Sequence, residues 1–192
     1  EAMIANEAIL AIALRDGRHG DQAQALQARG IFLLEDDPVA AMEAGFEAAE
    51  AARRAGSRGG EIISLANAAE SAVDLGRWQR ADEAPAKLRA MEHGPLSDGI
   101  ELSSAMLAAL RGDLLGADVM LESTERTTTG DLATRTWFLR VRSLVELLRG
   151  NLAEGYELGM EAVRADPMGM NTPNAVWDAA RAALWLRDDP ER

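Results

Sequence analysis

The 192-residue sequence contains no cysteine, and this absence excludes a disulfide framework and thiolate chemistry. The sequence also lacks an apolar run close to the roughly 20 residues that a membrane-spanning helix needs. No basic stretch precedes its first apolar residues, as a secretion signal would require. We therefore expect a cytoplasmic protein with no membrane partner.

Lysine is nearly absent. Lys87 is the only lysine, and arginine supplies the other Lys and Arg side chains. The 20 Lys and Arg residues stand against 32 Asp and Glu residues, which gives a net charge of −12. Affinity for nucleic acid comes mainly from basic side chains that neutralise phosphates. We therefore expect no direct binding of nucleic acid.

Residue types that carry catalysis are also sparse. The two histidines, His19 and His93, have no glutamate or histidine partner at metal-ligand spacing. The glycine-rich stretch 56–60 lacks the lysine followed by serine or threonine of a phosphate-binding loop, so it indicates a flexible connection. We assign no catalytic, cofactor-binding or metal-binding residue, and we expect this segment not to be an enzyme.

What the sequence does contain is one short turn, repeated five times. The copies centre on positions 36, 76, 112, 150 and 188, which are separated by 40, 36, 38 and 38 residues. A repeat at this interval is typical of a stacked helical array. The five copies are Glu35-Asp36-Asp37-Pro38, Leu75-Gly76-Arg77-Trp78, Arg111-Gly112-Asp113-Leu114, Arg149-Gly150-Asn151-Leu152 and Arg187-Asp188-Asp189-Pro190.

Each copy combines a helix stop with a helix start. Gly76, Gly112 and Gly150 are placed to end a helix in the left-handed conformation that glycine adopts without steric cost. Asp113 and Asn151 follow as N-caps, whose side-chain oxygens accept the first backbone N–H groups of the next helix. In the first and last copies an Asp-Pro pair supplies the cap and the first helical residue. Because the Asp-Asp pairs recur at this same point, capping is favoured over a divalent-metal site.

These signals predict a chain made only of helices. No stretch alternates apolar and polar residues, so we expect an all-α fold, in a single domain over residues 1–192. Pro85 is expected to bend one helix, because proline removes a backbone hydrogen bond. The expected helices cover residues 1–15, 21–35, 38–55, 60–75, 78–92, 97–111, 114–125, 131–149, 152–165 and 173–187.

The stretch 75–84, Leu-Gly-Arg-Trp-Gln-Arg-Ala-Asp-Glu-Ala, resembles the central turn of a tetratricopeptide repeat. Small residues also recur five positions after four of the turns, at Ala41, Ala81, Ala117 and Gly155. The resemblance covers nearly the whole chain. It implies a right-handed superhelix of about four to five antiparallel helix pairs, an α-solenoid. The spacing of 36 to 40 residues exceeds the usual 34 of that family, so the repeats are divergent.

The array is similar to the C-terminal repeats of large bacterial regulators. In those proteins an ATPase module precedes the repeats and is joined to a LuxR-type DNA-binding domain or a nucleotide cyclase domain. The resemblance implies a role in signal transduction or transcription regulation for a longer protein. The start of the chain in mid-helix at Glu1, and its end just after Pro190, lead us to expect that it is a piece of such a protein.

Stacked helix pairs curve into a groove that is lined by the first helix of each pair. The repeat register predicts a partner-binding groove lined by Ile63, Asn67, Glu70, Asp74, Met106, Trp137, Arg140 and Asp178. Two alternatives stay open. Met106 and Trp137, at helical spacing, are also typical of core packing, and the polar residues 67, 70 and 74 are also typical of a solvated helix face.

Three functions are compatible with these features. The first, which we favour, is a non-catalytic interaction module that holds a peptide, a partner domain or its own ATPase domain. The second is a small-molecule effector sensor, which needs a closed pocket with convergent polar groups. The third is an all-α enzyme, which needs acidic side chains that converge in a cleft with shifted pKa values.

The last expected helix, 173–187, has an apolar side formed by Val176, Trp177, Ala180 and Leu184, and we expect neighbouring helices to cover it. Trp185 lies well around the helix from this side, and we expect it to be exposed. The isolated chain could therefore form a dimer through the exposed ends of the array.

Overall fold

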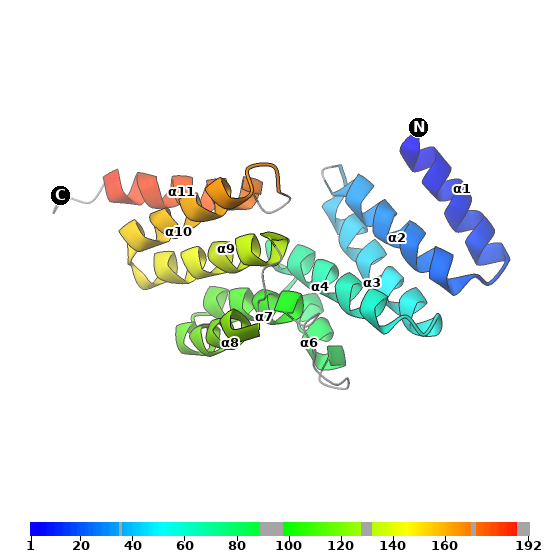
Figure 1. Cartoon of the computed structure of the whole chain (residues 1–192), viewed down its shortest axis with the longest axis horizontal. Coiled ribbons are helices and arrows are strands. Elements are labelled where there is room, and N and C mark those ends of the chain that lie inside the picture. The colour runs from blue at the N-terminus through cyan, green and yellow to red at the C-terminus, as the bar shows by residue number, and fades with distance from the viewer. Residues whose placement is uncertain (35, 89–97, 128–131, 170–171, 188–192) are drawn as a thin grey trace. The chain divides into compact units, whose positions relative to one another are not determined.

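The computed structural model describes residues 1–34, 36–88, 98–127, 132–169 and 172–187 (Figure 1). Every regular element in these ranges is a helix, so the all-α prediction is confirmed. The helices begin and end within two residues of the predicted ranges, with the exception of 78–92. They are α1 (Ala2–Arg15), α2 (His19–Leu33), α3 (Pro38–Arg54), α4 (Arg58–Asp74), α5 (Trp78–Ala81), α6 (Glu83–Leu88), α7 (Asp98–Leu110), α8 (Leu114–Thr127), α9 (Leu132–Arg149), α10 (Leu152–Ala165) and α11 (Thr172–Arg187).

The chain forms two compact units, Glu1–Ser103 and Ser104–Arg192, which we call unit 1 and unit 2. The boundary between them falls within α7. A single domain over residues 1–192 stays a prediction, and each unit is described by itself.

Five of the corners between helices share one backbone arrangement around a glycine. The glycine φ angles lie between +66° and +91°, in the left-handed region. In each corner the glycine N–H donates to the carbonyl three residues earlier, and the next N–H donates to the carbonyl five residues before it. This is the Schellman pattern, which satisfies carbonyls that a helix end would otherwise leave unpaired. The glycines are Gly17, Gly56, Gly76, Gly112 and Gly150.

The conformation predicted for Gly76, Gly112 and Gly150 is therefore confirmed. The stretch 56–60 was expected to be a flexible connection, and this expectation is wrong. Gly56 ends α3 in the same tight turn, and α4 begins two residues later at Arg58. The loop after α1 is equally short, because Gly17 takes the same conformation and α2 begins at His19.

The predicted N-caps are confirmed in part. Asp37 Oδ1 accepts the Ala40 N–H at 3.0 Å, and Asp113 Oδ1 accepts the Gly116 N–H at 2.9 Å. Asn151 occupies the N-cap position of α10, but its side chain makes no capping bond. Its Nδ2 donates to Glu146 Oε2 at 2.6 Å instead. The side chain therefore bonds to a carboxylate on the preceding helix and does not cap the backbone N–H groups of α10. Asp188, Asp189, Pro190 and His93 lie outside the described residues.

Pro85 explains why the helix predicted over 78–92 is divided. A proline lacks the N–H that would donate to Ala81, and its ring crowds that carbonyl. The chain accordingly ends α5 at Ala81, makes a turn at Asp82 and continues as α6 from Glu83. The break is therefore a local consequence of one residue.

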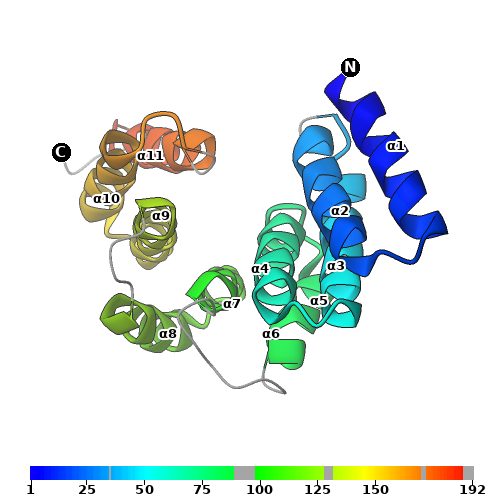
Figure 2. The ribbon, with the colours of Figure 1, turned by 45° about the vertical axis from the view of Figure 1, so that its right-hand side comes forward.

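In unit 1, the first four helices pack in chain order, each on the next (Figure 2). Much of the buried surface is alanine, and Ala13, Ala48, Ala52, Ala69 and Ala72 have no exposed surface. Helix α3 approaches α4 so closely that a Cβ added at Gly45 would lie 3.0 Å from the Ala68 Cβ. Small side chains therefore set the distance between neighbouring helices.

In unit 2, α10 packs between α9 and α11, and its small residues face both neighbours. A Cβ added at Gly155 would lie 2.8 Å from Leu147 Cγ on α9, and one at Gly159 would lie 3.2 Å from the Ala179 Cβ on α11. Ser143 Oγ donates to the Gly155 carbonyl at 2.6 Å. Gly155 thus lies where the repeat pattern placed a small residue, at a close contact between two helices.

The glycine corners lead to a prediction with a built-in control. Gly17→Ala should lower the free energy of unfolding by about 1–2 kcal/mol, because alanine is strained in the left-handed region. Nothing lies within 4 Å of the added Cβ, so the effect comes from the backbone alone. Gly20→Ala, three residues away inside α2, has equal space and should raise stability by about 0.5 kcal/mol. Urea denaturation followed by circular dichroism measures both, and equal effects at the two positions would contradict the proposed role of the turn.

Candidate functional site

The residues predicted to line a groove fall into two groups. Four lie on one helix of unit 1, and we call them the α4 surface: Ile63, Asn67, Glu70 and Asp74. The other four lie on α7, α9 and α11: Met106, Trp137, Arg140 and Asp178.

The α4 surface faces solvent. Its residues follow one another at spacings of four, three and four, which puts them on one side of a helix. Ile63 is 45% exposed, Asn67 and Asp74 are exposed, and Glu70 is half-buried. The opposite side of α4 is packed and includes Leu65, Ala69 and Val73. One apolar side chain, one amide and two carboxylates are therefore accessible along about three helical turns.

Helix α2 extends this surface, and the sequence reasoning missed its contribution. Gln27 Nε2 donates to Ser64 Oγ at 2.7 Å, so a side chain of α2 reaches α4. Gln24 and Ile31 share the Gln27 side of α2, and both are exposed. Gln27 and Ser64 are 37 residues apart, three fewer than the 40 that separate the first two turns, so the repeat spacing did not predict this contact.

Met106 and Trp137 lie inside the fold. Met106 is 2% exposed and Trp137 is 7% exposed, so both are core residues, which is the alternative to a place in the groove. The Trp137 indole Nε1 is buried and has no hydrogen-bond partner among the described residues. Helix α9 is buried at eleven positions, from Thr136 to Leu147, so that it has little free face on which a groove could form.

Arg140 and Asp178 come together, but as a buried pair. Arg140 Nε lies 3.8 Å from Asp178 Oδ2, and both side chains are almost fully buried. Arg181 Nη1 lies 3.9 Å from the other oxygen of Asp178 and is half exposed. A buried pair that joins α9 to α11 positions these helices relative to one another and is not open to a partner. The expectation that the two residues face an open groove is corrected by this burial.

The apolar side of α11 is exposed, which corrects the expectation that neighbouring helices cover it. Trp177 is 71% exposed, and Val176, Ala180 and Leu184 are exposed as well. The packed side of α11 consists of Thr172, Ala175, Asp178, Ala179 and Ala182. Small residues face α9 and α10, so the large apolar residues point outward. Trp185 is exposed, as predicted.

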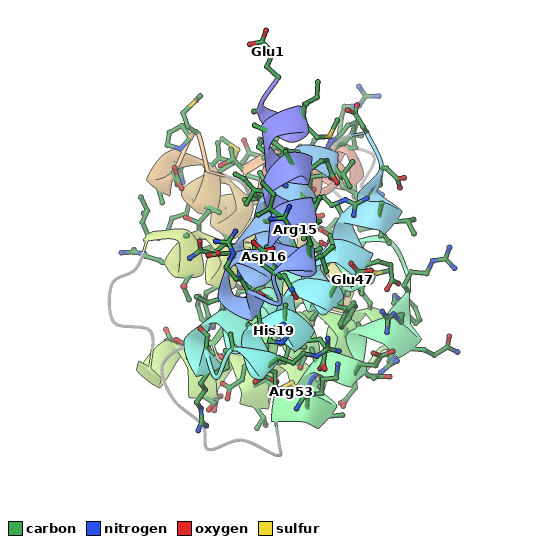
Figure 3. The ribbon with its side chains drawn as sticks, turned by 90° about the vertical axis from the view of Figure 1, so that its right-hand side faces the viewer. Glu1, Arg15, Asp16, His19, Glu47 and Arg53 are labelled. Carbon is green, nitrogen blue, oxygen red and sulfur yellow. The ribbon has the colours of Figure 1, made fainter. Side chains whose placement is uncertain are left out.

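The ionisable groups form short surface clusters in unit 1. At the end of α1, Arg15 Nε lies 2.7 Å from Asp16 Oδ1 (Figure 3). At the end of α3, the Arg53 guanidinium donates to Glu50, and Arg54 adds a second contact, which together lower the pKa of Glu50 to about 2. Burial raises the pKa of Glu61 in the first turn of α4, although the nearby Arg53 acts in the opposite direction.

The described residues contain no group of three or more His, Asp or Glu side chains that could hold a metal ion. His19 Nδ1 lies 3.1 Å from Gln22 Oε1 within α2. No helix in the described ranges is both long and apolar enough to cross a membrane. Comparisons with protein-family models, with curated proteins and with solved structures give no match.

The buried pair leads to a test of its structural role. Arg140→Met should lower the free energy of unfolding by about 3 kcal/mol, because it removes the buried cationic partner of the almost fully buried Asp178 carboxylate. Adding Asp178→Asn should recover part of the loss, since the amide carries no charge. Arg135 lies on α9, as Arg140 does, and forms a surface ion pair with Glu161 on α10. Arg135→Met should therefore cost less than about 1 kcal/mol. Similar losses for Arg135→Met and Arg140→Met in urea denaturation would argue against a buried pair.

The raised pKa of Glu61 leads to a prediction about pH. The folded chain favours the protonated carboxyl, so Glu61 contributes stability that is present below its unfolded pKa of 4.5 and is lost as the pH rises through the folded pKa. Glu61→Gln carries no charge at any pH. The stability of this variant relative to the parent should therefore increase as the pH rises from below 4.5 to neutral, measured by urea denaturation. Glu47→Gln, at an exposed position on α3, is the control (Figure 3), and a flat difference for Glu61→Gln would contradict the assignment.

Proposed function

We propose that this chain is a TPR-like α-solenoid that works as a non-catalytic protein-interaction module in a cytoplasmic bacterial regulator of signalling or transcription. Its partner is a peptide segment or another domain of the same protein. The observation that carries the proposal is the α4 surface, where accessible apolar, amide and carboxylate groups share one helix face.

Support for the repeat comes from side-chain contacts between a helix and the second helix after it. Gln27 on α2 bonds to Ser64 on α4, and Arg80 on α5 bonds to Glu43 on α3, in both cases across 37 residues. Arg140 on α9 pairs with Asp178 on α11 across 38 residues, which is the distance between the turns at 150 and 188. Neighbouring units of a solenoid contact one another, so similar separations in the three contacts agree with stacking.

The Arg80 contact is the most complete of these links. Its guanidinium reaches Glu43 on α3 and Glu83 on α6, and it lies 4.1 Å from the centre of the Phe46 ring. The two carboxylates raise the pKa of Arg80, with the hydrogen bond to Glu83 as the largest cause. A planar guanidinium that bridges two acids and an aromatic ring fixes the angle between consecutive helices.

Support for a binding role comes from the chemistry of the α4 surface. An asparagine side chain donates and accepts hydrogen bonds, so Asn67 can pair with the amide groups of an extended peptide. Glu70 and Asp74, one turn and two turns further along, favour basic side chains on that peptide. Ile63 and the neighbouring Ile31 offer apolar contacts. The surface therefore suits an extended segment that carries lysine or arginine together with apolar residues.

The test is a selection of random peptides on the purified chain by phage display. We expect the enriched peptides to be basic and partly apolar. The variant Asn67→Ala, Glu70→Arg, Asp74→Arg should bind the best of them at least about tenfold more weakly, because two attractions become repulsions. Titration by fluorescence anisotropy gives the two dissociation constants.

The control is Glu122→Arg with Glu157→Arg, which makes the same change in net charge at exposed positions on α8 and α10. This variant should bind like the parent. Equal weakening in both variants would show that the net charge of −12, and not the α4 surface, governs the binding. Unchanged binding by the α4 variant would refute the proposed site.

A further inference from the structure

The four residues of the α4 surface form a nearly straight row along the helix. A helix turns by about 100° per residue, so the four positions fall within an arc of about 60°. A helix also rises by about 1.5 Å per residue, so Asn67 lies about 6 Å from Ile63 along the axis. Glu70 and Asp74 lie about 10.5 Å and about 16.5 Å from Ile63. The midpoint of the two carboxylate positions is therefore about 13.5 Å from Ile63.

An extended peptide that runs along this row matches its spacing. Such a peptide rises by about 3.3 Å per residue, and every second side chain points to the same side. When one of its residues lies on Ile63, the second residue after it lies about 6.6 Å further on, beside Asn67. The fourth residue lies about 13.2 Å further on, beside the midpoint of the two carboxylates. Both of these side chains point toward α4, as the first one does.

A helical peptide does not match the row in the same way. At about 1.5 Å per residue, its ninth residue would be the one beside the two carboxylates. Nine residues at about 100° each turn that side chain to the opposite side of the peptide helix, away from α4. The row therefore favours an extended ligand.

Two carboxylates one helical turn apart favour arginine over lysine on the ligand. A guanidinium is planar and has five N–H donors, so it can bond to two acids at once, whereas an ammonium group is a compact point charge. The chain itself uses arginine in this way. Arg149 donates to Asp118 at 2.6 Å and to Glu146 at 2.5 Å, and Arg80 bridges two glutamates as described above.

The ligand residue beside Asn67 should be small. Asn67 is exposed, and its amide can donate to a peptide carbonyl and accept from a peptide N–H. A large ligand side chain that points at Asn67 would hold the peptide backbone away from this amide. Glycine, alanine or serine at that position lets the backbone approach.

We propose that the α4 surface selects an extended segment with an apolar residue, a small residue two positions from it and an arginine four positions from it. The apolar residue contacts Ile63, the backbone pairs with Asn67, and the arginine bridges Glu70 and Asp74. This inference rests on the proposed interaction role of the α4 surface and names the class of sequence that it binds. Either chain direction satisfies the spacing.

The spacing is tested with labelled peptides of serine and alanine that carry one leucine and one arginine, two to nine positions apart and in both orders. Fluorescence anisotropy with the whole chain, up to about 1 mM, gives the dissociation constants. Spacing four should bind at least about threefold more tightly than spacings three and five, because their arginine points away from α4. Replacing this arginine by lysine should weaken binding by a similar factor, because only one of the two ion pairs remains.

The outcomes separate this inference from the proposed function. An optimum at another spacing, equal binding at all spacings, or equal binding of lysine and arginine would overturn the inference, although peptides selected by phage display could still require the α4 surface. The same holds if the selected peptides bind and none of the leucine–arginine peptides does. If the selected peptides also ignore the α4 substitutions, the proposed site fails, and the inference fails with it.

Single substitutions in the chain test the bridge. Glu70→Gln and Asp74→Asn each leave one carboxylate, so each should make the arginine and lysine peptides of spacing four bind about equally. Glu122→Gln makes the same change in net charge at an exposed position on α8, and it should keep the preference for arginine. Circular dichroism verifies that the variants fold. A preference for arginine that persists in both Glu70→Gln and Asp74→Asn would overturn the bridge.

Discussion

The corners of this chain depend on the hydrogen bonds around a left-handed glycine. At such a glycine two carbonyls of the ending helix are satisfied, and the chain reverses within two residues. The next helix therefore returns along the one before it, at a distance that short connections keep small. Five corners, at Gly17, Gly56, Gly76, Gly112 and Gly150, repeat this geometry. The positions of these corners determine where several of the helices end and where the next ones begin.

The side chains at the contacts between helices are mostly small or polar, and their size and polarity determine how the helices pack. Alanine fills much of the interior of unit 1, and Gly155 and Gly159 let α10 approach both of its neighbours in unit 2. Small side chains bury little apolar surface each, so close approach of the backbones has to supply much of the contact. Directional bonds between repeats, such as Gln27 with Ser64 and Arg80 with Glu43, then fix the register that alanine alone leaves loosely specified.

The sequence predicted local structure well, because caps and glycine turns act within a few residues. It predicted most helix bounds and the conformation of three glycines, whereas at Pro85 it predicted a bend in one helix and the structure has two helices, α5 and α6. Which face of a helix is buried was harder to predict, because burial depends on the elements that pack against each side of the helix. The repeat register predicted that Trp137 and Arg140 lie on an open face, yet α9 is covered on most sides. On α11 the large apolar residues were expected to be buried, but the buried residues are mainly alanines. The close contact with α10 leaves no room for Trp177 or Leu184 on the packed side.

The same packing rule explains why an apolar face of α11 stays open. A helix whose buried side consists mainly of alanine and other small residues carries its large apolar residues on the other side. Helix α11 has this arrangement, with Ala175, Ala179 and Ala182 inside and Trp177 and Leu184 outside. Scattered exposed apolar residues are ordinary on a protein surface, whereas an apolar row along one helix face is typical of an interaction site. Close packing between α11 and its neighbours thereby leaves the large apolar residues of this helix exposed.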